Sequence, residues 1–299
     1  AYVMVPMFIT PAPGLKGPVS FHVRRFRPRV AWSRMKSTHW LVQTNVSAES
    51  PTPASLREAC RLAERSFFEF PVPPGATALP PLPRECHGSP VVFHGRSPLI
   101  LAALRSPFKG GVFFDPERFG NDAYAQGYGD GYINSDAMVL TWRALLVNAE
   151  ASSRYVFLKP NDDYKLFTGL ALHSSSIPAL FADIQSKAKR DLLDQEVVVA
   201  EAKEVDGEWR FIVVDGQVVA SSMYRPICSS DVPSDVVIFA KSMVSTWVPA
   251  PVFCLDIGRV NGCYKVIECN CFNASRFYAA DVRSIVEAVS SYQEGRTDW

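Results

Sequence analysis

The sequence lacks the features that mark several large classes of protein. No apolar run approaches the roughly 18 to 20 residues of a membrane-spanning helix, so we expect no membrane partner. The net charge of +1 gives the whole chain no electrostatic reason to bind nucleic acid. Neither GxxxxGK[ST] nor GxGxxG is present. What remains is a globular composition, 47% hydrophobic and 20% charged, in 299 residues that suffice for two domains.

Cysteine and histidine form no cluster either. Seven cysteines, an odd number without a CxxC repeat, do not suggest a disulfide framework, so we expect buried thiols and a reducing, cytoplasmic compartment. The five histidines show no HxxxH spacing and no arrangement like Ser-His-Asp. We expect them to be structural, with His94 the best candidate to line a cleft. Carboxylates, amides, lysines and arginines must therefore carry the chemistry.

Acidic residues are missing from residues 1–39, which we treat as a basic, proline-rich N-terminal arm. We expect a partly extended arm that packs on its own protein or on a neighbour. Contact with phosphate or nucleic acid, and a role in targeting, are the alternatives. Its basic residues are Lys16, Arg24, Arg25, Arg27, Arg29, Arg34 and Lys36.

Residues 40–150 follow the order of a small α/β domain. A helix is predicted at 55–66, with Ser55 as its cap and Glu58 at the capping-box spacing. Residues 113–134 are predicted to be a loop. The predicted strands are 40–46, 67–72 and 90–95, and the other predicted helices are 98–106 and 135–150.

Residues 151–299 predict a mostly antiparallel sheet with helices, an α+β arrangement. Asp215-Gly216 predicts a tight hairpin turn. The predicted strands are 155–160, 196–205, 208–216, 217–225, 252–260 and 263–270, and the predicted helices are 176–190, 235–247 and 279–294.

Acidic and amide side chains gather on the last two predicted strands. Glu268 and Asn270 are two residues apart on one strand, so they face the same side. If the strands pair around Asn261-Gly262, Asp256 comes opposite Glu268. Such an all-oxygen cluster suits Mg²⁺, or Mn²⁺ as the alternative, and does not suit zinc. The other interpretation is a solvated strand end with unrelated polar residues.

Two thiols alternate with this cluster. Cys269 and Cys271 point away from Glu268 and Asn270 on the same strand, so we expect both to face the core. Mg²⁺ typically keeps coordination positions for phosphate oxygens, so the cluster implies a phosphate-bearing ligand.

Basic residues on other predicted strands fit such a ligand. Lys159 ends one strand and Lys165 follows in a polar loop, a pattern that can bind phosphate or be a lysine-bearing surface hairpin. Arg210 and Arg225 lie on adjacent strands and can neutralise a polyphosphate or an anionic intermediate. Structural ion pairing with Glu208 or Glu204 is the alternative.

The order of these features, from the strand lysine to the D…ExN pair, resembles the ATP-grasp superfamily, in detail a RimK-like branch common in bacteria and phages. The segments EWRFIVVDGQVVASSMYR and VIECN carry the resemblance most specifically, and it runs from about Trp40 to Tyr292. It implies an α/β fold of ATP-grasp architecture. The implied domains are the arm at 1–39, an α/β pre-grasp domain at 40–150 and a nucleotide-binding domain at 151–299.

The resemblance also implies residue roles. ATP and Mg²⁺ would be the cofactors. The implied catalytic residues are Arg210, Arg225 and Asn273; the nucleotide would contact Lys159, Lys165, Val199, Ala200 and Glu201; the metal ligands would be Asp256, Glu268 and Asn270. The phosphate loop NDDYKLFTG departs from the family because it is not glycine-rich and carries Asp162 and Asp163.

The implied activity is ATP-dependent carboxylate–amine ligation through an acyl-phosphate intermediate. The implied partners are a small-molecule or peptide carboxylate and an amine, and the oligomeric state stays open. An ATP-dependent phosphotransferase and a non-enzymatic binding or structural protein of the same fold are the alternatives. We expect the loops 110–135 and 223–234 to set substrate specificity, although the aromatic residues of the first can equally be packing.

Overall fold

The computed structural model describes most of the chain beyond its basic arm. Nearly all of the arm, and Lys165, lie outside the described residues. No helix in the described part of the chain is long and apolar enough to span a membrane. The described residues are 37–44, 52–73, 77–149, 154–161, 167–188 and 190–297.

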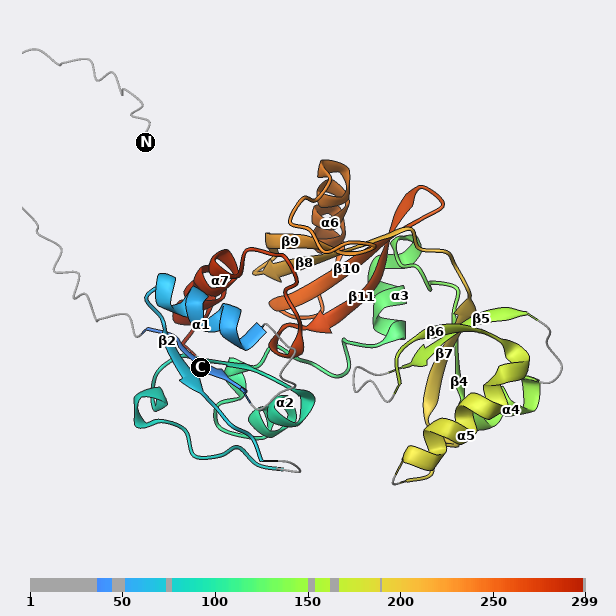
Figure 1. Ribbon diagram of the computed structural model, residues 1–299, viewed down its shortest axis with the longest axis horizontal. Helices are drawn as coiled ribbons and strands as arrows, with labels where there is room; N and C mark the ends of the chain where they lie inside the picture. Colours follow the sequence, from blue (N-terminus) through green and yellow to red (C-terminus); the bar gives the residue numbers. More distant parts are fainter. Residues whose placement is uncertain are drawn as a thin grey trace, which may run out of the picture. The chain divides into compact units, whose positions relative to one another are not determined.

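A three-stranded parallel sheet forms the first part (Figure 1). Its order is β2-β1-β3, with α1 and α2 packed on it. Trp40 and Val42 of β1 pack with α1, while Leu41 packs with α2, which explains why the strand is apolar without alternation. The α/β prediction is confirmed. The elements are β1 (His39–Val42), α1 (Thr52–Leu62), β2 (Ser66–Glu69), β3 (Val91–His94) and α2 (Ser97–Leu104).

The start of α1 differs from the prediction. The helix begins at Thr52, so Ser55 lies inside it and is not the cap. Pro53 in the first turn explains the earlier start, because that turn has no need of its backbone N–H.

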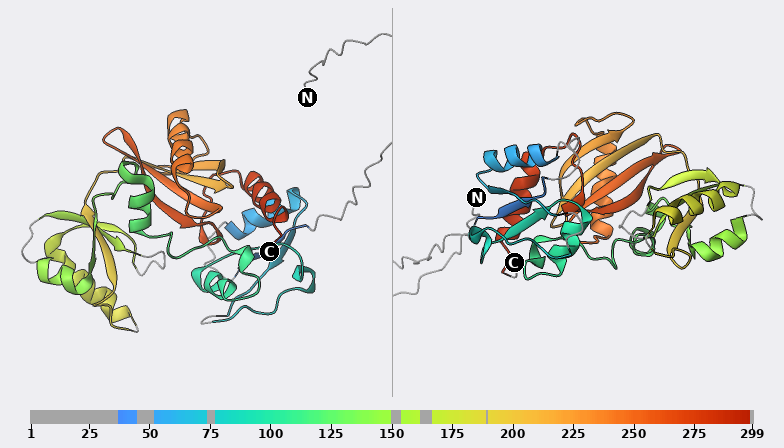
Figure 2. Two further views of the ribbon diagram at one scale, coloured as in Figure 1. Left: turned by 180° about the vertical axis from the view of Figure 1, so that it is seen from behind. Right: turned by 60° about the horizontal axis from the view of Figure 1, so that its bottom comes forward.

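A four-stranded antiparallel sheet of order β4-β7-β5-β6 forms the second part, with α4 and α5 packed on one face (Figures 1 and 2). Alternate residues of β5, Val156 and Leu158, are buried against these helices. The elements are β4 (Met138–Thr141), α4 (Trp142–Ala149), β5 (Tyr155–Pro160), β6 (Leu170–His173), α5 (Ile177–Lys187) and β7 (Glu196–Glu201).

Two predictions fail in this sheet. The helix predicted over 135–150 begins with a strand, β4, because MVLT pairs antiparallel with β7. β6 was not predicted, and its four residues gain their order by pairing with β5. Because β4 belongs to the same sheet as β7, this sheet crosses the domain boundary that we expected at residue 150.

A second antiparallel sheet, of order β11-β10-β8-β9, completes the fold (Figure 1). Its two predicted hairpin turns are present: Asp215-Gly216 and Asn261-Gly262 all have positive φ, as a two-residue turn requires. Helices α3 and α6 pack on one face and α7 packs with α1 on the other. The elements are β8 (Gly207–Val214), β9 (Gln217–Arg225), α6 (Ser234–Thr246), β10 (Val252–Val260), β11 (Cys263–Cys271) and α7 (Val282–Glu294).

The segment predicted to be a loop, 113–134, contains a helix, α3 (Asn121–Tyr128). The Tyr124 hydroxyl donates to the Cys269 carbonyl at 2.8 Å, and Tyr132 bridges to Val266 of β11. The aromatic residues of this segment are therefore core packing: Phe113, Phe119, Tyr124, Tyr128 and Tyr132 are all buried. The short 3-10 helices are η1 (Arg84–Cys86), η2 (Lys109–Gly111), η3 (Gly129–Gly131), η4 (Ser174–Ser176) and η5 (Phe272–Ala274).

Candidate active site

The sheet register places three charged residues side by side on neighbouring strands. Asp256 of β10 lies opposite Glu268 of β11, as predicted, and opposite Arg210 of β8 on its other side. Residues opposite one another in a sheet point to the same face, so the three side chains share one face. The site is thus built from strand pairing alone.

A β-bulge makes this register possible. The two-residue turn pairs Val260 with Cys263, and counting back without interruption would put Asp256 opposite Ile267. The register shifts between Asp256 and Ile257, which brings Glu268 opposite Asp256 instead. Without that shift Glu268 would point to the other face of the sheet.

Gly258 accommodates the bulge. A Cβ atom at this position would lie 2.9 Å from side-chain atoms of both Ile267 and Val205. The missing side chain of Gly258 therefore lets Ile267 lie against β10.

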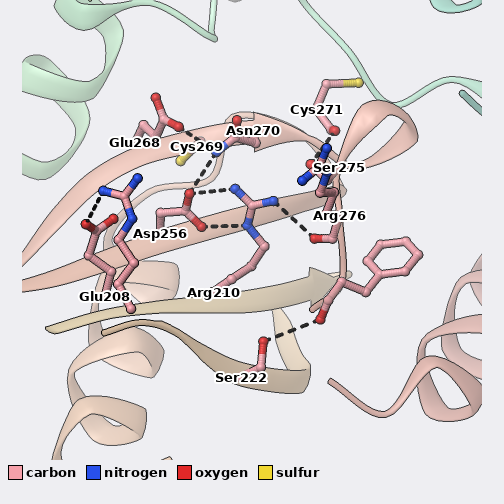
Figure 3. Close-up of polar contacts among 12 residues, drawn as sticks. Glu208, Arg210, Ser222, Asp256, Glu268, Cys269, Asn270, Cys271, Ser275 and Arg276 are labelled. Carbon is pink, nitrogen blue, oxygen red and sulfur yellow. Dashed lines mark hydrogen bonds and ion pairs between the residues drawn. The ribbon is translucent and has the colours of Figure 1, made fainter. Parts of the chain in front are cut away.

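The face carries a continuous polar network (Figure 3). Arg210 donates from Nε to Asp256 Oδ1 at 2.7 Å and from Nη2 to Oδ2 at 2.6 Å. The Asn270 Nδ2 donates to Asp256 Oδ2 and to Glu268 Oε1, both at 3.0 Å. Arg210, Asp256 and Asn270 are 6%, 2% and 2% exposed, while Glu268 is half-buried. Glu268 is thus the most accessible member of the network.

Electrostatics keep Arg210 charged in this buried position. Burial alone would lower its pKa, but the adjacent Asp256 carboxylate raises the pKa well above its ordinary value. A buried pair of this kind is costly to break, because the remaining partner is left as an uncompensated charge.

The thiols face the core, as predicted. Cys269 is buried with α3 and α6, and its Sγ lies 3.3 Å from the Tyr128 hydroxyl. Burial raises the pKa of Cys269 well above its usual range, so the thiol stays protonated. Cys271 is also buried, in a separate apolar cluster with Leu41 and Phe93. A soft-metal site at this strand end is not supported.

The donor set fits a hard cation. The Asn270 Nδ2 lies 3.0 Å from an oxygen of both Glu268 and Asp256, so both carboxylates converge on one point. Turning the amide over would present its oxygen to that point, giving an all-oxygen set. Among the described residues no three His, Cys, Asp or Glu side chains gather as a metal site, so the amide is essential to this set.

The nucleotide residues predicted on the other sheet lie on β5 and β7. Lys159 is on the face of β5 opposite to the buried Val156 and Leu158. Its Nζ lies 5.7 Å from the ring centre of Tyr124 and 5.9 Å from that of Tyr132. Lys165 lies outside the described residues.

The predicted hinge is the end of β7. The β4 ladder stops at Val199, whereas the β5 ladder continues to Glu201. In the described residues, the edge of β7 at Ala200 and Glu201 therefore has no strand partner on the β4 side. Backbone groups on that edge can serve a ligand such as adenine.

Sequence reasoning missed Lys203, which follows this hinge. Its Nζ donates to the Ile133 carbonyl at 2.8 Å and to Asp136 at 3.2 Å, and this hydrogen bond lowers the pKa of Asp136. Ile133 in turn donates to the Val266 carbonyl of β11. The only sequence signal was a lysine shortly after the hinge strand.

Arg225 does not join Arg210 in the network. It lies opposite Glu208 and donates to its carboxylate at 3.0 Å, with 70% of its side chain exposed. The ion-pair alternative considered from the sequence is therefore what the structure contains.

Asn273 is fully buried among backbone groups. Its Nδ2 donates to the Phe93 and Gly111 carbonyls at 2.6 and 3.0 Å, and its Oδ1 accepts from the Phe113 N–H at 2.7 Å. These contacts support a role in joining the first sheet to the strand end rather than a contact with substrate.

His94 does not line a cleft. Its side chain is buried, and Nε2 lies 3.0 Å from the Ser275 carbonyl. Burial lowers its pKa to about 4, so the ring is neutral near pH 7.

Comparisons with known proteins agree with this geometry. A family model described as an ATP-grasp domain, family 3 of its clade, matches residues 130–289, more than half of the chain. No curated protein sequence matches the chain.

Three solved structures are similar over nearly their whole length. D-cycloserine synthetase DcsG has a TM-score of 0.55 at 16% identity, covering 86% of this chain and 99% of that one. ATP-grasp ligase PsnB complexed with minimal precursor has 0.53 at 15%, covering 86% and 99%. A RimK domain ATP-grasp protein from Sphaerobacter thermophilus has 0.52 at 11%, covering 87% and 100%. At these identities the likeness shows a shared fold.

Proposed function

The chain belongs to this family of ATP-grasp domains, and from that premise we propose that it is an ATP-dependent carboxylate–amine ligase. The observation that carries the proposal is the face shared by Arg210, Asp256, Glu268 and Asn270. A hard-cation donor set beside a buried guanidinium is suited to a reaction in which negative charge moves between phosphate and carboxylate.

In this proposal Glu268, Asn270 and Asp256 hold Mg²⁺. The ion, when bound, would neutralise phosphate oxygens and polarise the γ-phosphate. Asp256 already accepts hydrogen bonds from Arg210 and Asn270, so it would share its oxygens between these donors and the ion. Mn²⁺ has the same preference for oxygen and is the alternative.

The nucleotide would lie between the two antiparallel sheets' polar residues. Lys159, with Lys165, would bind phosphates, and the unpaired edge of β7 at Val199, Ala200 and Glu201 would bind adenine or ribose. Lys203 would keep that edge in place through its bond to Ile133. These roles rest on position and on the chemistry of each group.

The reaction would proceed in two steps. A substrate carboxylate oxygen bonds to the γ-phosphorus, the bond to the β,γ-bridging oxygen breaks, and ADP leaves with the electron pair. The amine nitrogen then bonds to the acyl carbon, the carbon–oxygen bond to phosphate breaks, and the amine proton goes to the departing phosphate. Arg210 would stabilise the charge on the acyl-phosphate, and positioning supplies much of the remaining rate.

Turnover with a surrogate amine tests the proposal. Hydroxylamine converts any acyl-phosphate to a hydroxamate, so a panel of amino acids, short peptides and small acids can be screened for ADP release and hydroxamate together. We expect both products for at least one carboxylate, and neither with Glu268→Gln. ADP release with a stable phosphorylated product and no hydroxamate would instead indicate a phosphotransferase.

A further inference from the structure

The loop that follows β11 returns over the sheet and covers Arg210. Arg210 Nη1 donates to the Arg276 carbonyl at 3.1 Å, and the Ser222 hydroxyl donates to the Phe277 carbonyl at 3.4 Å (Figure 3). Ser275 ties the start of the loop to the Cys271 carbonyl at 2.8 Å. The loop is therefore fixed to three strands of the sheet.

Two adjacent aromatic residues of this loop point to different environments. Phe277 is buried in the core with Phe272 and His94. Tyr278 is 41% exposed and stacks on the half-buried Tyr224 of β9, with ring centres 4.8 Å apart and an angle of 12°. Tyr224 covers only one face of the Tyr278 ring.

Tyr278 also has an unusual backbone. Its φ of 52° lies in the left-handed region, which disfavours bulky side chains and which glycine adopts readily. A large aromatic residue at such a position, with much of its ring left in solvent, is not explained by packing on Tyr224 alone.

The position of the ring relative to Arg210 suggests what it does. The Arg210 guanidinium lies 5.2 Å from the Tyr278 ring centre and 5.8 Å from that of Tyr224. A carboxylate that becomes an acyl-phosphate beside Arg210 must carry the rest of its molecule away from the buried Asp256 and Asn270. The exposed Tyr278 ring is the apolar surface next to that guanidinium.

We infer that Tyr278 is a specificity-determining residue for the carboxylate substrate, and that it selects an acid with a flat, aromatic group close to its carboxyl. This inference rests on the proposed function. The substrate's ring would lie on Tyr278 while its carboxylate reaches Arg210, so that the stack Tyr224–Tyr278 extends by one ring. Ring pairs of this kind add to affinity beyond the area they bury.

Binding to the nucleotide-loaded protein tests the inference without turnover. The protein is first loaded with Mg²⁺ and a non-hydrolysable ATP analogue, and the analogue's affinity is recorded. Dissociation constants for N-acetyl-L-phenylalanine and N-acetylglycine are then measured by saturation-transfer NMR. We expect the aromatic acid to bind about tenfold more tightly.

Three variants make the test specific. Tyr278→Gly removes the ring but accepts the left-handed backbone, so we expect it to fold and to bind the analogue as the wild type does, while its preference falls to within twofold. Tyr278→Phe should keep the preference. Glu64→Gly is the matched control, because exposed Glu64 has nearly the same φ, 53°, on a helix end away from this loop, and it should change nothing.

The outcomes separate the two proposals. An analogue that binds, with no preference in the wild type or an unchanged preference in Tyr278→Gly, would overturn the inference and leave the proposed function standing. An analogue that does not bind to the wild type would overturn the proposed function, and the inference with it.

Discussion

Two arginine–carboxylate pairs cross neighbouring strands of the same sheet, and they differ in almost every physical respect. Arg210 and Asp256 are buried and share two hydrogen bonds, at 2.6 and 2.7 Å. Arg225 and Glu208 share one at 3.0 Å, with the guanidinium largely in solvent. The residue types are nearly the same, so burial and geometry alone separate a functional centre from a surface contact.

The largest expected effect follows from breaking the buried pair. Asp256→Ala leaves Arg210 as an uncompensated buried charge, so the free energy of unfolding should fall by about 3–5 kcal/mol. Urea denaturation measures it. The control is the double variant Arg210→Met/Asp256→Leu, which removes both charges and should recover most of that loss. A loss below about 1 kcal/mol for Asp256→Ala would show that the pair is not buried as described.

His94 provides a buried group that loses its charge instead of keeping it. Its pKa is about 4 when folded, against the usual 6.5. The unfolded chain therefore binds more protons below pH 6.5, and stability that is fully present above pH 6.5 is lost as the pH falls toward 4. The loss attributable to His94 should be about 2 kcal/mol at pH 5.

The variant His94→Gln isolates this contribution. It keeps an N–H donor for the Ser275 carbonyl but does not titrate. Urea unfolding at pH 7 and pH 5 should show a smaller drop in stability for the variant than for the wild type. Equal drops in both proteins would mean that His94 is accessible to protons in the folded state.

The smallest effect is expected from the exposed pair. Glu208→Gln or Arg225→Gln should change the free energy of unfolding by less than about 1 kcal/mol. Adding 1 M NaCl should reduce the difference from the wild type further, because exposed charges are screened. A loss as large as that of Asp256→Ala would contradict the distinction between the two pairs.

How far the sequence predicts this site depends on which interactions are local. The alternation of Glu268, Cys269 and Asn270 and the turn at Asn261-Gly262 are local, so the oxygen cluster and the buried thiols were predicted correctly. The bulge that brings Glu268 opposite Asp256 was not visible, since it depends on Ile267 packing against Gly258.

Other residues take their roles from distant parts of the chain. Asn273 is explained by the carbonyls of Phe93 and Gly111, about 160 to 180 residues away in sequence. The strand β4 forms because β7 lies beside it, and α3 because its tyrosines pack on β11. Local propensity carries no information about such partners, which is why these elements were read as helix and loop.

The central claim is that this face of the sheet binds Mg²⁺ and ATP, and the melting temperature tests it most directly. A ligand that binds only the folded chain must raise it, by about 5 °C when the concentration far exceeds the dissociation constant. We predict such a rise with millimolar Mg²⁺ and ATP, none with ATP and a chelator, and none in Glu268→Ala. No rise in the wild type, or an equal rise in Glu268→Ala, would contradict the account.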